Sequence, residues 1–129
     1  MSRVDVRKTH KLFIGGAFPR SESGRTYEVT DSKEQFLANM ALASRKDARD
    51  AVLAARSAVA KWSAATAYNR GQVLYRIAEV MEGRREQFIS EVSDSEGVSS
   101  RKAGSHIDAA IDRWVWYAGW ADQYAQVIG

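Results

Sequence analysis

The residues that could do acid, base or metal chemistry are few and scattered. Neither His10 nor His106 has a second histidine or a cysteine at ligand spacing, so a plain surface or hydrogen-bonded histidine is the favoured interpretation of each. Four carboxylates in the middle of the chain follow helical spacing and read as a solvent-exposed helix face: Glu79, Glu82, Glu86 and Asp94. Acid and base chemistry by paired carboxylates needs desolvation that nothing in this pattern indicates. The residues alone therefore predict no catalytic site.

Two further kinds of chemistry are excluded or disfavoured by residue type. The chain contains no cysteine, which excludes disulfides, cysteine-ligated metals and thiolate nucleophiles. Gly15-Gly16 is followed by neither Lys-Ser/Thr nor a predicted helix, so it is interpreted as a hairpin turn and not as a phosphate-binding loop. No cofactor-binding residue is predicted in this chain.

Length and composition indicate one globular domain over residues 1–129. Hydrophobic residues make up 45% and charged residues 27%, which is typical of a folded protein and not of a disordered one. The net charge of +3 is spread along the chain, so we expect no nucleic-acid partner. No apolar run approaches the roughly 20 residues that span a bilayer, and the first ten residues lack the apolar segment of a signal peptide. We expect no membrane partner and a cytoplasmic location.

The elements that would position any site begin with short strands. After a polar lead-in over residues 1–10, apolar residues flank Gly15-Gly16, a dipeptide suited to a two-residue hairpin turn. Residues 26–29 predict a short strand, and the alternation over residues 36–42 predicts another extended segment. Ser44 and Asp47 have capping-box spacing and start a helix that continues to Trp62.

Two more long helices are predicted, over residues 68–92 and 100–127, with a turn over residues 94–100 between them. Gly71 and Gly83 weaken the first of these by roughly 1 kcal/mol each if they lie inside it. The predicted fold is therefore mixed α/β: an N-terminal β-hairpin and short strands followed by three long helices.

The last predicted helix carries two apolar stripes. The first has the spacing of a core-facing side: Ile107, Ala110, Ile111, Trp114, Ala118, Ala121, Ala125 and Ile128. The second lies beside it and consists of Trp116, Tyr117, Trp120 and Tyr124. Half exposed, four aromatic side chains would form a patch of roughly 300–500 Å², about the largest on an ordinary monomer. We expect a partner chain or a missing part of the same protein to cover this interface stripe; the alternative is that the chain's own strands fold over it.

These segments together resemble the N-terminal part of the aldehyde dehydrogenase superfamily. The resemblance covers residues 12–129 and rests on the order of several short motifs. They are Leu12-Phe-Ile-Gly-Gly16, Ser23-Gly24-Arg-Thr-Tyr27, Asp47, Ala51-Val52, Ala54-Ala55-Arg56, Trp62, Arg70, Leu74, Ile77-Ala78, Arg84-Arg85-Glu86 and Tyr117-Ala-Gly-Trp-Ala-Asp122. The chain departs from the family where Val98 replaces a lysine and where Asp31-Ser32 replaces Asn-Pro, which suggests a divergent member.

The resemblance implies an incomplete nucleotide-binding domain. Family members oxidise aldehydes to carboxylic acids through a cysteine, with hydride passing to NAD or NADP, but the matching region stops before the residues that do this. It also implies a monovalent cation held in some members by positions matching Val29, Thr30 and Asp108; an aspartate on a wet helix edge is the plainer interpretation of Asp108.

Two hypotheses follow. In the first, the chain is the front part of an NAD(P)-dependent aldehyde dehydrogenase, inactive by itself, and the remainder of that enzyme covers the interface stripe. Because the sequence ends directly after a predicted helix, we expect Gly129 to be a cut end and not a natural C-terminus. In the second, the chain is a free-standing interaction or oligomerisation module derived from that family, and self-association covers the stripe.

Overall fold

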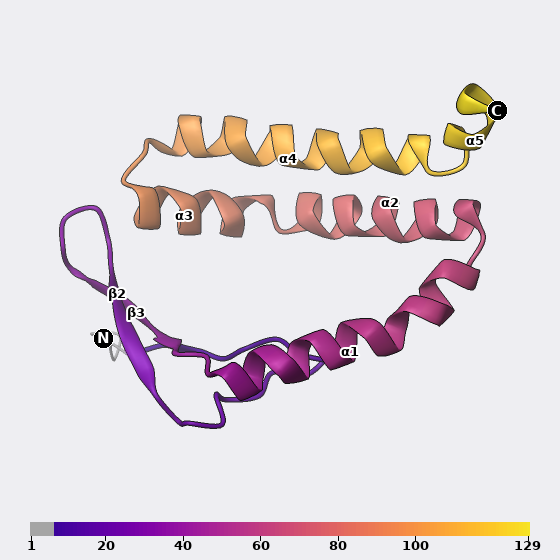
Figure 1. Ribbon diagram of the computed structural model, residues 1–129. Helices are drawn as coiled ribbons and strands as arrows, with labels where there is room; N and C mark the ends of the chain where they lie inside the picture. The colour runs from indigo at the N-terminus through magenta and orange to yellow at the C-terminus, as the bar shows by residue number, and fades with distance from the viewer. Residues whose placement is uncertain (1–6) are drawn as a thin grey trace. The chain divides into compact units, whose positions relative to one another are not determined.

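The computed structural model describes residues 7–129; residues 1–6 lie outside the described part. In chain order its elements are β1 (Thr9–His10), β2 (Thr26–Thr30), β3 (Phe36–Ala41), α1 (Arg45–Ala64), α2 (Ala67–Gly83), α3 (Arg85–Glu96), α4 (Ser100–Trp120) and α5 (Tyr124–Ile128) (Figure 1). This order confirms the mixed α/β class. The elements form two compact units, Met1–Ala60 and Lys61–Gly129. The prediction of a single domain over residues 1–129 stays a prediction.

The first unit is built on a small mixed sheet with the strand order β1-β3-β2. β2 pairs with β3 in antiparallel fashion, with Tyr27 opposite Met40, as expected for two short strands close in sequence. β1 pairs in parallel with the other edge of β3, with His10 opposite Met40. The interpretation of residues 1–10 as a polar lead-in was wrong for Thr9 and His10. Two residues are too few to show a period, and β1 exists only through its pairing with β3.

The Gly15-Gly16 hairpin turn is confirmed. Ile14 and Ala17 exchange both backbone hydrogen bonds, at 3.0 and 3.1 Å. Gly15 and Gly16 have φ angles of +61° and +81°, the left-handed conformations that a two-residue turn of this kind requires and that glycine adopts without steric cost.

The capping box at the start of α1 is also confirmed. The Ser44 N–H donates to Asp47 Oδ2 at 2.8 Å, and the Asp47 N–H donates to Ser44 Oγ at 3.3 Å. The same carboxylate reaches a distant turn, because the Ser21 hydroxyl donates to Oδ2 at 2.6 Å and the Glu22 N–H donates to Oδ1 at 3.1 Å. The Ser21 hydrogen bond is the main reason that the pKa of Asp47 falls from 3.8 to about 2. One buried carboxylate thus starts the helix and fastens the preceding loop to it.

The second unit contains α2 to α5, and α2 and α3 both pack along α4 (Figure 1). Its core lies between α3 and α4, where Ile89, Ala103 and Ile107 are buried. The partly buried residues around this core are Phe88, Val92, Val98 and Ile111. The apolar spacing predicted for both helices therefore faces the core where α3 and α4 meet.

The prediction of a single helix over residues 68–92 was wrong, because this stretch divides into α2 and α3. Arg84 has φ −114° and ψ 18°, outside the helical region, and its N–H donates to Met81 O at 3.1 Å in a tightened last turn. Gly83 stands directly before this break, where its low helix propensity makes an interruption inexpensive. Apolar periodicity alone does not reveal such a break, since Phe88 and Val92 stay in phase with the residues of α2.

The turn predicted over residues 94–100 is shorter than expected. α3 continues to Glu96 and ends at Gly97, whose φ of +66° closes the helix in the left-handed conformation. The Ser93 hydroxyl donates to Val98 O at 2.7 Å across this turn. Ser99 then caps α4 by accepting a hydrogen bond from the Lys102 N–H at 3.3 Å.

The predicted helix over residues 100–127 also divides. α4 ends at Trp120, and a turn follows in which the Ala121 N–H donates to Ala118 O at 3.3 Å and the Gln123 N–H donates to Trp120 O at 3.1 Å. The short α5 follows, with Ile128 62% exposed. The prediction that Trp114, Ala125 and Ile128 face the core is wrong, because all three are exposed. Helices gain most of their stability from a packed face, and nothing in residues 7–129 buries these three side chains.

The chain buries little for its length. Within residues 7–129, the buried hydrophobic residues are Ala38, Ala78, Ile89, Ala103, Ile107 and Ala118, and no large side chain is fully enclosed. Even the predicted apolar face of α1 stays open, with Val52 56%, Val59 57% and Trp62 46% exposed. Large apolar side chains are normally among the most buried, so this chain presents apolar faces that it does not itself cover.

Candidate interaction surface

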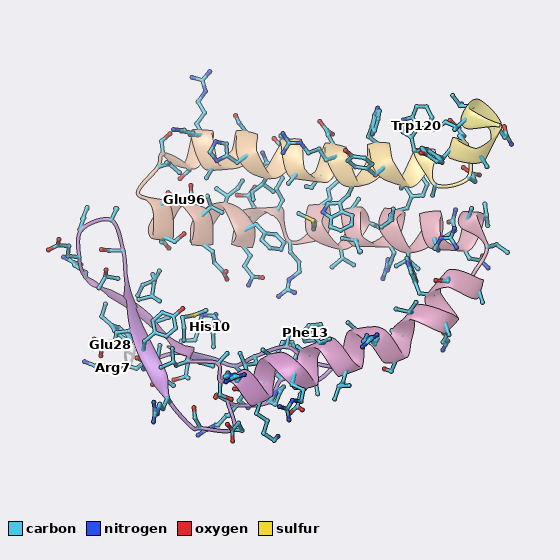
Figure 2. The ribbon with its side chains drawn as sticks, viewed as in Figure 1. Arg7, His10, Phe13, Glu28, Glu96 and Trp120 are labelled. Carbon is cyan, nitrogen blue, oxygen red and sulfur yellow. The ribbon has the colours of Figure 1, made fainter. Side chains whose placement is uncertain are left out.

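The predicted interface stripe stands at the C-terminal end of α4 and on α5. We call Trp116, Tyr117, Trp120 and Tyr124 the aromatic surface. Trp116 is 58% exposed, and Tyr117 and Tyr124 are each 60% exposed. Trp120 is half-buried and lies near the end of α4, close to α5 (Figure 2). The expectation that these side chains would be exposed is met for Trp116, Tyr117 and Tyr124 but only in part for Trp120, while their role as an interface stays a prediction.

Small residues on the opposite side of α4 explain why the aromatic residues face outward. Ala118 is buried, and a Cβ atom built on Gly71 of α2 would lie 3.0 Å from the Ala118 carbonyl oxygen and 3.3 Å from the Ala121 Cβ. This close approach leaves no room for a large side chain between the helices at the level of Gly71 and Ala118. The bulky residues of this stretch are consequently placed on the outer face.

The aromatic rings pack mainly on each other. The Trp116 and Tyr117 rings meet edge to face, with centroids 5.0 Å apart and planes at 88°. The Trp116 and Trp120 centroids are 5.6 Å apart, with planes at 50°. Both distances lie in the range of favourable aromatic pairs. The rings therefore form a pre-assembled apolar platform whose outer faces remain available.

The apolar surface continues onto α2, which the sequence interpretation missed. A hollow of about 310 Å³ between the two helices is lined by Leu74, Ala110, Arg113, Trp114 and Tyr117. A second hollow of about 320 Å³ lies along α2 and is lined by Val73, Arg76, Ile77, Val80 and Met81. Val73 and Val80, 45% and 44% exposed, lie seven residues apart, the spacing of one helix face. That spacing was a sequence signal for a second exposed stripe.

Asp108, the predicted ligand of a monovalent cation, is engaged by an arginine. Arg85 Nε donates to Asp108 Oδ1 at 2.7 Å and Arg85 Nη2 donates to Oδ2 at 2.8 Å. This hydrogen bonding is the main reason that the pKa of Asp108 lies below its ordinary value. Val29 and Thr30 belong to the first unit and Asp108 to the second. The cation site that would join them stays a prediction.

The remaining candidate groups do not come together. His106 and the carboxylates of Glu79, Glu82, Glu86 and Asp94 are all exposed, as expected for a wet helix face, and His10 is half-buried in β1. In the part of the chain that the structure describes, no three His, Cys, Asp or Glu side chains form a metal-binding group. Between residues 7 and 129, no helix is both long and apolar enough to cross a bilayer.

The Gly15-Gly16 turn does not have the form of a dinucleotide-binding turn. Such a turn places glycines between a strand and the N-terminus of a helix, where the pyrophosphate binds. Gly15 and Gly16 instead form a hairpin tip between Ile14 and Ala17, and no helix follows them directly.

A short mixed sheet followed by paired helices with exposed apolar faces defines a mixed α/β fold. The sequence profile of the aldehyde dehydrogenase family matches residues 18–128. The chain belongs to the aldehyde dehydrogenase family, which confirms the resemblance noted from its motifs.

The curated relatives are much longer than this chain. It is 33% identical over 127 residues to the cytosolic 10-formyltetrahydrofolate dehydrogenase of Pongo abelii, covering 95% of this chain and 14% of that protein. It is 29% identical over 112 residues to the D-glyceraldehyde dehydrogenase (NADP(+)) of Thermoplasma acidophilum, covering 86% of this chain and 23% of that protein. The chain therefore spans between about a seventh and a quarter of the length of these relatives.

Solved structures give the same picture of the fold. HpcC of Thermus thermophilus matches with a TM-score of 0.87 at 27% identity, over 90% of this chain and 23% of that one. An aldehyde dehydrogenase of Bacillus cereus matches with a TM-score of 0.84 at 31% identity, over 88% of this chain and 24% of that one. A betaine aldehyde dehydrogenase of Staphylococcus aureus, solved with NAD⁺, shares the fold with a TM-score of 0.85 at 24% identity.

Proposed function

We propose that this chain supplies the N-terminal part of the cofactor domain of an NAD(P)-dependent aldehyde dehydrogenase and is not catalytic by itself. The observation that carries the proposal is the match of residues 18–128 to the family, together with the small share of each relative that the chain spans. Cysteine, the nucleophile that the family resemblance implies, does not occur in the chain. Nucleophile and cofactor site then both belong to the remainder of the enzyme.

The uncovered apolar faces support this proposal. Trp116 and Tyr117 on α4 and Val73 on α2 expose apolar area in a chain that buries few large side chains. Removing apolar area from water is favourable by roughly 25 cal/mol per Å². The remainder of the same enzyme, folding onto these helices, would bury that area. In this arrangement the chain contributes structure to the cofactor domain and no reacting group.

The activity test uses the purified 129-residue chain. It is mixed with NAD⁺ or NADP⁺ and a panel of aliphatic, aromatic and hydroxylated aldehydes, and reduced cofactor is followed by its absorbance. We expect no turnover, whereas the betaine aldehyde dehydrogenase of Staphylococcus aureus, as the positive control, oxidises its own substrate in the same buffer. Turnover of any aldehyde by the pure chain would overturn the proposal.

The size of the native protein tests the same proposal independently. An antibody raised against this chain is used to blot an extract of the source cells. We expect a band several times larger than the 14.4 kDa of the chain. A band only at 14.4 kDa would contradict the proposal and favour the alternative, a free-standing module whose aromatic surface is covered by self-association.

The alternative is favoured by one specific observation, the pre-assembled ring platform of Trp116, Tyr117 and Trp120. Aromatic residues are enriched in the centres of protein interfaces. In this case the chain would form a symmetric dimer, and the aromatic platforms of both copies would be buried against each other. For either candidate we propose a cytoplasmic location and no nucleic-acid or membrane partner. Similar proteins include a cytosolic 10-formyltetrahydrofolate dehydrogenase of Pongo abelii and a mitochondrial one of Homo sapiens, so imaging of a tagged chain against both compartments tests the location.

A further inference from the structure

The first unit contains a small cavity that is lined by several basic residues. The cavity has a volume of about 130 Å³, well above the roughly 10–15 Å³ that one water molecule needs. Four of its lining residues carry basic side chains: His10, Lys11, Arg20 and Arg25. None of its nine lining residues carries a carboxylate. His10 belongs to β1 and lies near β2 and β3 of this unit (Figure 2).

The hairpin turn brings the first two permanent cations together. Ile14 pairs with Ala17 across the turn, and the Leu12 N–H donates to Pro19 O at 3.0 Å. Continuing this pairing by one step places Lys11 opposite Arg20. Two positive side chains directly opposite each other are destabilising unless a negative group lies between them. The backbone thus holds these two charges close together.

A second turn adds the third cation. The Gly24 N–H donates to Ser21 O at 2.9 Å, which reverses the chain after Arg20. Arg25 is then fixed at the entry to β2, because the Leu42 N–H donates to Arg25 O at 2.9 Å. The three basic residues therefore come from three separate backbone segments, each held by hydrogen bonds, and all three line one small cavity.

The carboxylates of Glu22 and Asp47, beside Ser21, accept hydrogen bonds from other groups. Across residues 7–129, none of Lys11, Arg20 and Arg25 forms an ion pair with an acidic side chain. The Asp47 carboxylate stands behind Ser21, whose hydroxyl donates to it at 2.6 Å, and it also accepts the N–H groups of Glu22 and Ser44. Its hydrogen-bonding capacity is thus largely used by other donors, and it does not line the cavity.

We propose that this cavity binds a tetrahedral oxyanion, either free phosphate or the phosphate group of a monoester. Three permanent cations around a space of this size match a phosphate group better than a carboxylate, since phosphate carries close to two negative charges and at least three acceptor oxygens. The proposal concerns the first unit alone and is independent of the function proposed above. The bound anion would hold the hairpin and the entry to β2 together.

Amide NMR of the isotopically labelled 129-residue chain tests the proposal. Inorganic phosphate and glycerol 3-phosphate are titrated separately, with sodium chloride adjusted to keep the ionic strength constant. We expect saturable shifts of the Lys11, Ser21 and Gly24 amide signals with at least one of the two ligands. Tighter binding of glycerol 3-phosphate would identify a monoester as the ligand, and tighter binding of phosphate would identify the free ion.

Charge-removing variants show whether the cavity is responsible. Arg25→Gln and Arg20→Gln should each weaken binding at least about tenfold, the loss of one charge-assisted hydrogen bond. The control is Arg56→Gln, which removes an exposed charge from α1 outside the cavity and should bind as the parent does. If one cavity variant no longer gives the dispersed amide spectrum of a folded first unit, the other variant is used for the test. The proposal would be overturned if neither ligand produced saturable shifts. It would also be overturned if Arg56→Gln weakened binding as much as the two cavity variants do.

Discussion

Arg85 and Asp108 join α3 to α4 through two parallel hydrogen bonds, of 2.7 and 2.8 Å. Gly104 makes room for this contact, since a Cβ atom there would lie 3.3 Å from Arg85 Nη2. The pair stands at the edge of the small core formed by Ile89 and Ile107. It therefore adds a two-point polar contact beside the apolar core that packs α3 against α4.

Arg85→Lys should lower the thermal midpoint of unfolding slightly. Lysine keeps the positive charge but cannot form both parallel hydrogen bonds with Asp108. The effect is small because both side chains are more than a third exposed to solvent. Calorimetry at low and high salt measures it, and the difference from the parent should shrink at high salt. Arg84→Lys is the control, because Arg84 donates to the neutral Gln87. An equal fall of the midpoint in both variants would contradict a stabilising role for the Arg85–Asp108 pair.

The pKa of Asp47 predicts an acid-sensitive first unit. Folding lowers this pKa from 3.8 to about 2, chiefly through the hydrogen bond from Ser21. A carboxylate with a depressed pKa stabilises the fold fully above its ordinary value, and the contribution disappears as the pH falls through the folded value. Stability from Asp47 should therefore be lost between about pH 4 and about pH 2.

Asp47→Asn should flatten this pH dependence and lower stability at neutral pH. Urea unfolding of the first unit, followed through its amide signals between pH 6 and pH 2, measures both effects. Asp50→Asn is the matched control, since Asp50 lies on the same helix but is exposed in a pair with Lys46. Equal loss of pH dependence in both variants would show that the contribution is not specific to Asp47.

Gly71→Ala should destabilise the contact between α2 and α4. The added Cβ atom would lie 3.0 Å from the Ala118 carbonyl oxygen, too close for two packed helices to accept unchanged. Overpacking typically costs about 1–3 kcal/mol, which exceeds the gain in helix propensity of about 1 kcal/mol. Gly83→Ala is the control, because a Cβ atom there meets nothing within 4 Å. Denaturant unfolding should show a loss for the first variant and no loss for the second.

Trp120→Asp should reduce any self-association of the isolated chain. A charge at the centre of the aromatic surface would have to be desolvated in every contact made there. Sedimentation velocity at several concentrations measures the distribution of masses. Gln126→Asp places the same charge on an exposed polar position of α5 and should leave association unchanged. An associating parent whose mass is unaltered by Trp120→Asp would exclude the aromatic surface as the contact.

Local chemistry was predictable wherever the decisive atoms lie close in sequence. Ser44 and Asp47 satisfy each other's backbone across three residues, and Gly15-Gly16 requires only its own φ angles. Both features were predicted from the sequence and found in the structure. The outward placement of Trp116 also followed from helical spacing, because the small residues of α4 leave it no inward position.

Features that depend on distant partners were not predictable in the same way. β1 exists because Thr9 lies opposite Asn39, thirty residues away. The second role of Asp47, which fastens the turn at Ser21, depends on a pairing across 26 residues. The break at Arg84 left the apolar period intact, so a pattern based on spacing had no means of detecting it.

The four tryptophans of the chain, at positions 62, 114, 116 and 120, all fall in the second unit, while the first contains one tyrosine, Tyr27. Tryptophan emission excited at long wavelength therefore reports on α4 and on the C-terminal end of α1, where Trp62 lies. A melting curve recorded in this way has no tryptophan in the strands or at the start of α1, and circular dichroism or NMR is needed to observe them. Comparing the two signals during unfolding would show directly whether the halves melt together or one after the other.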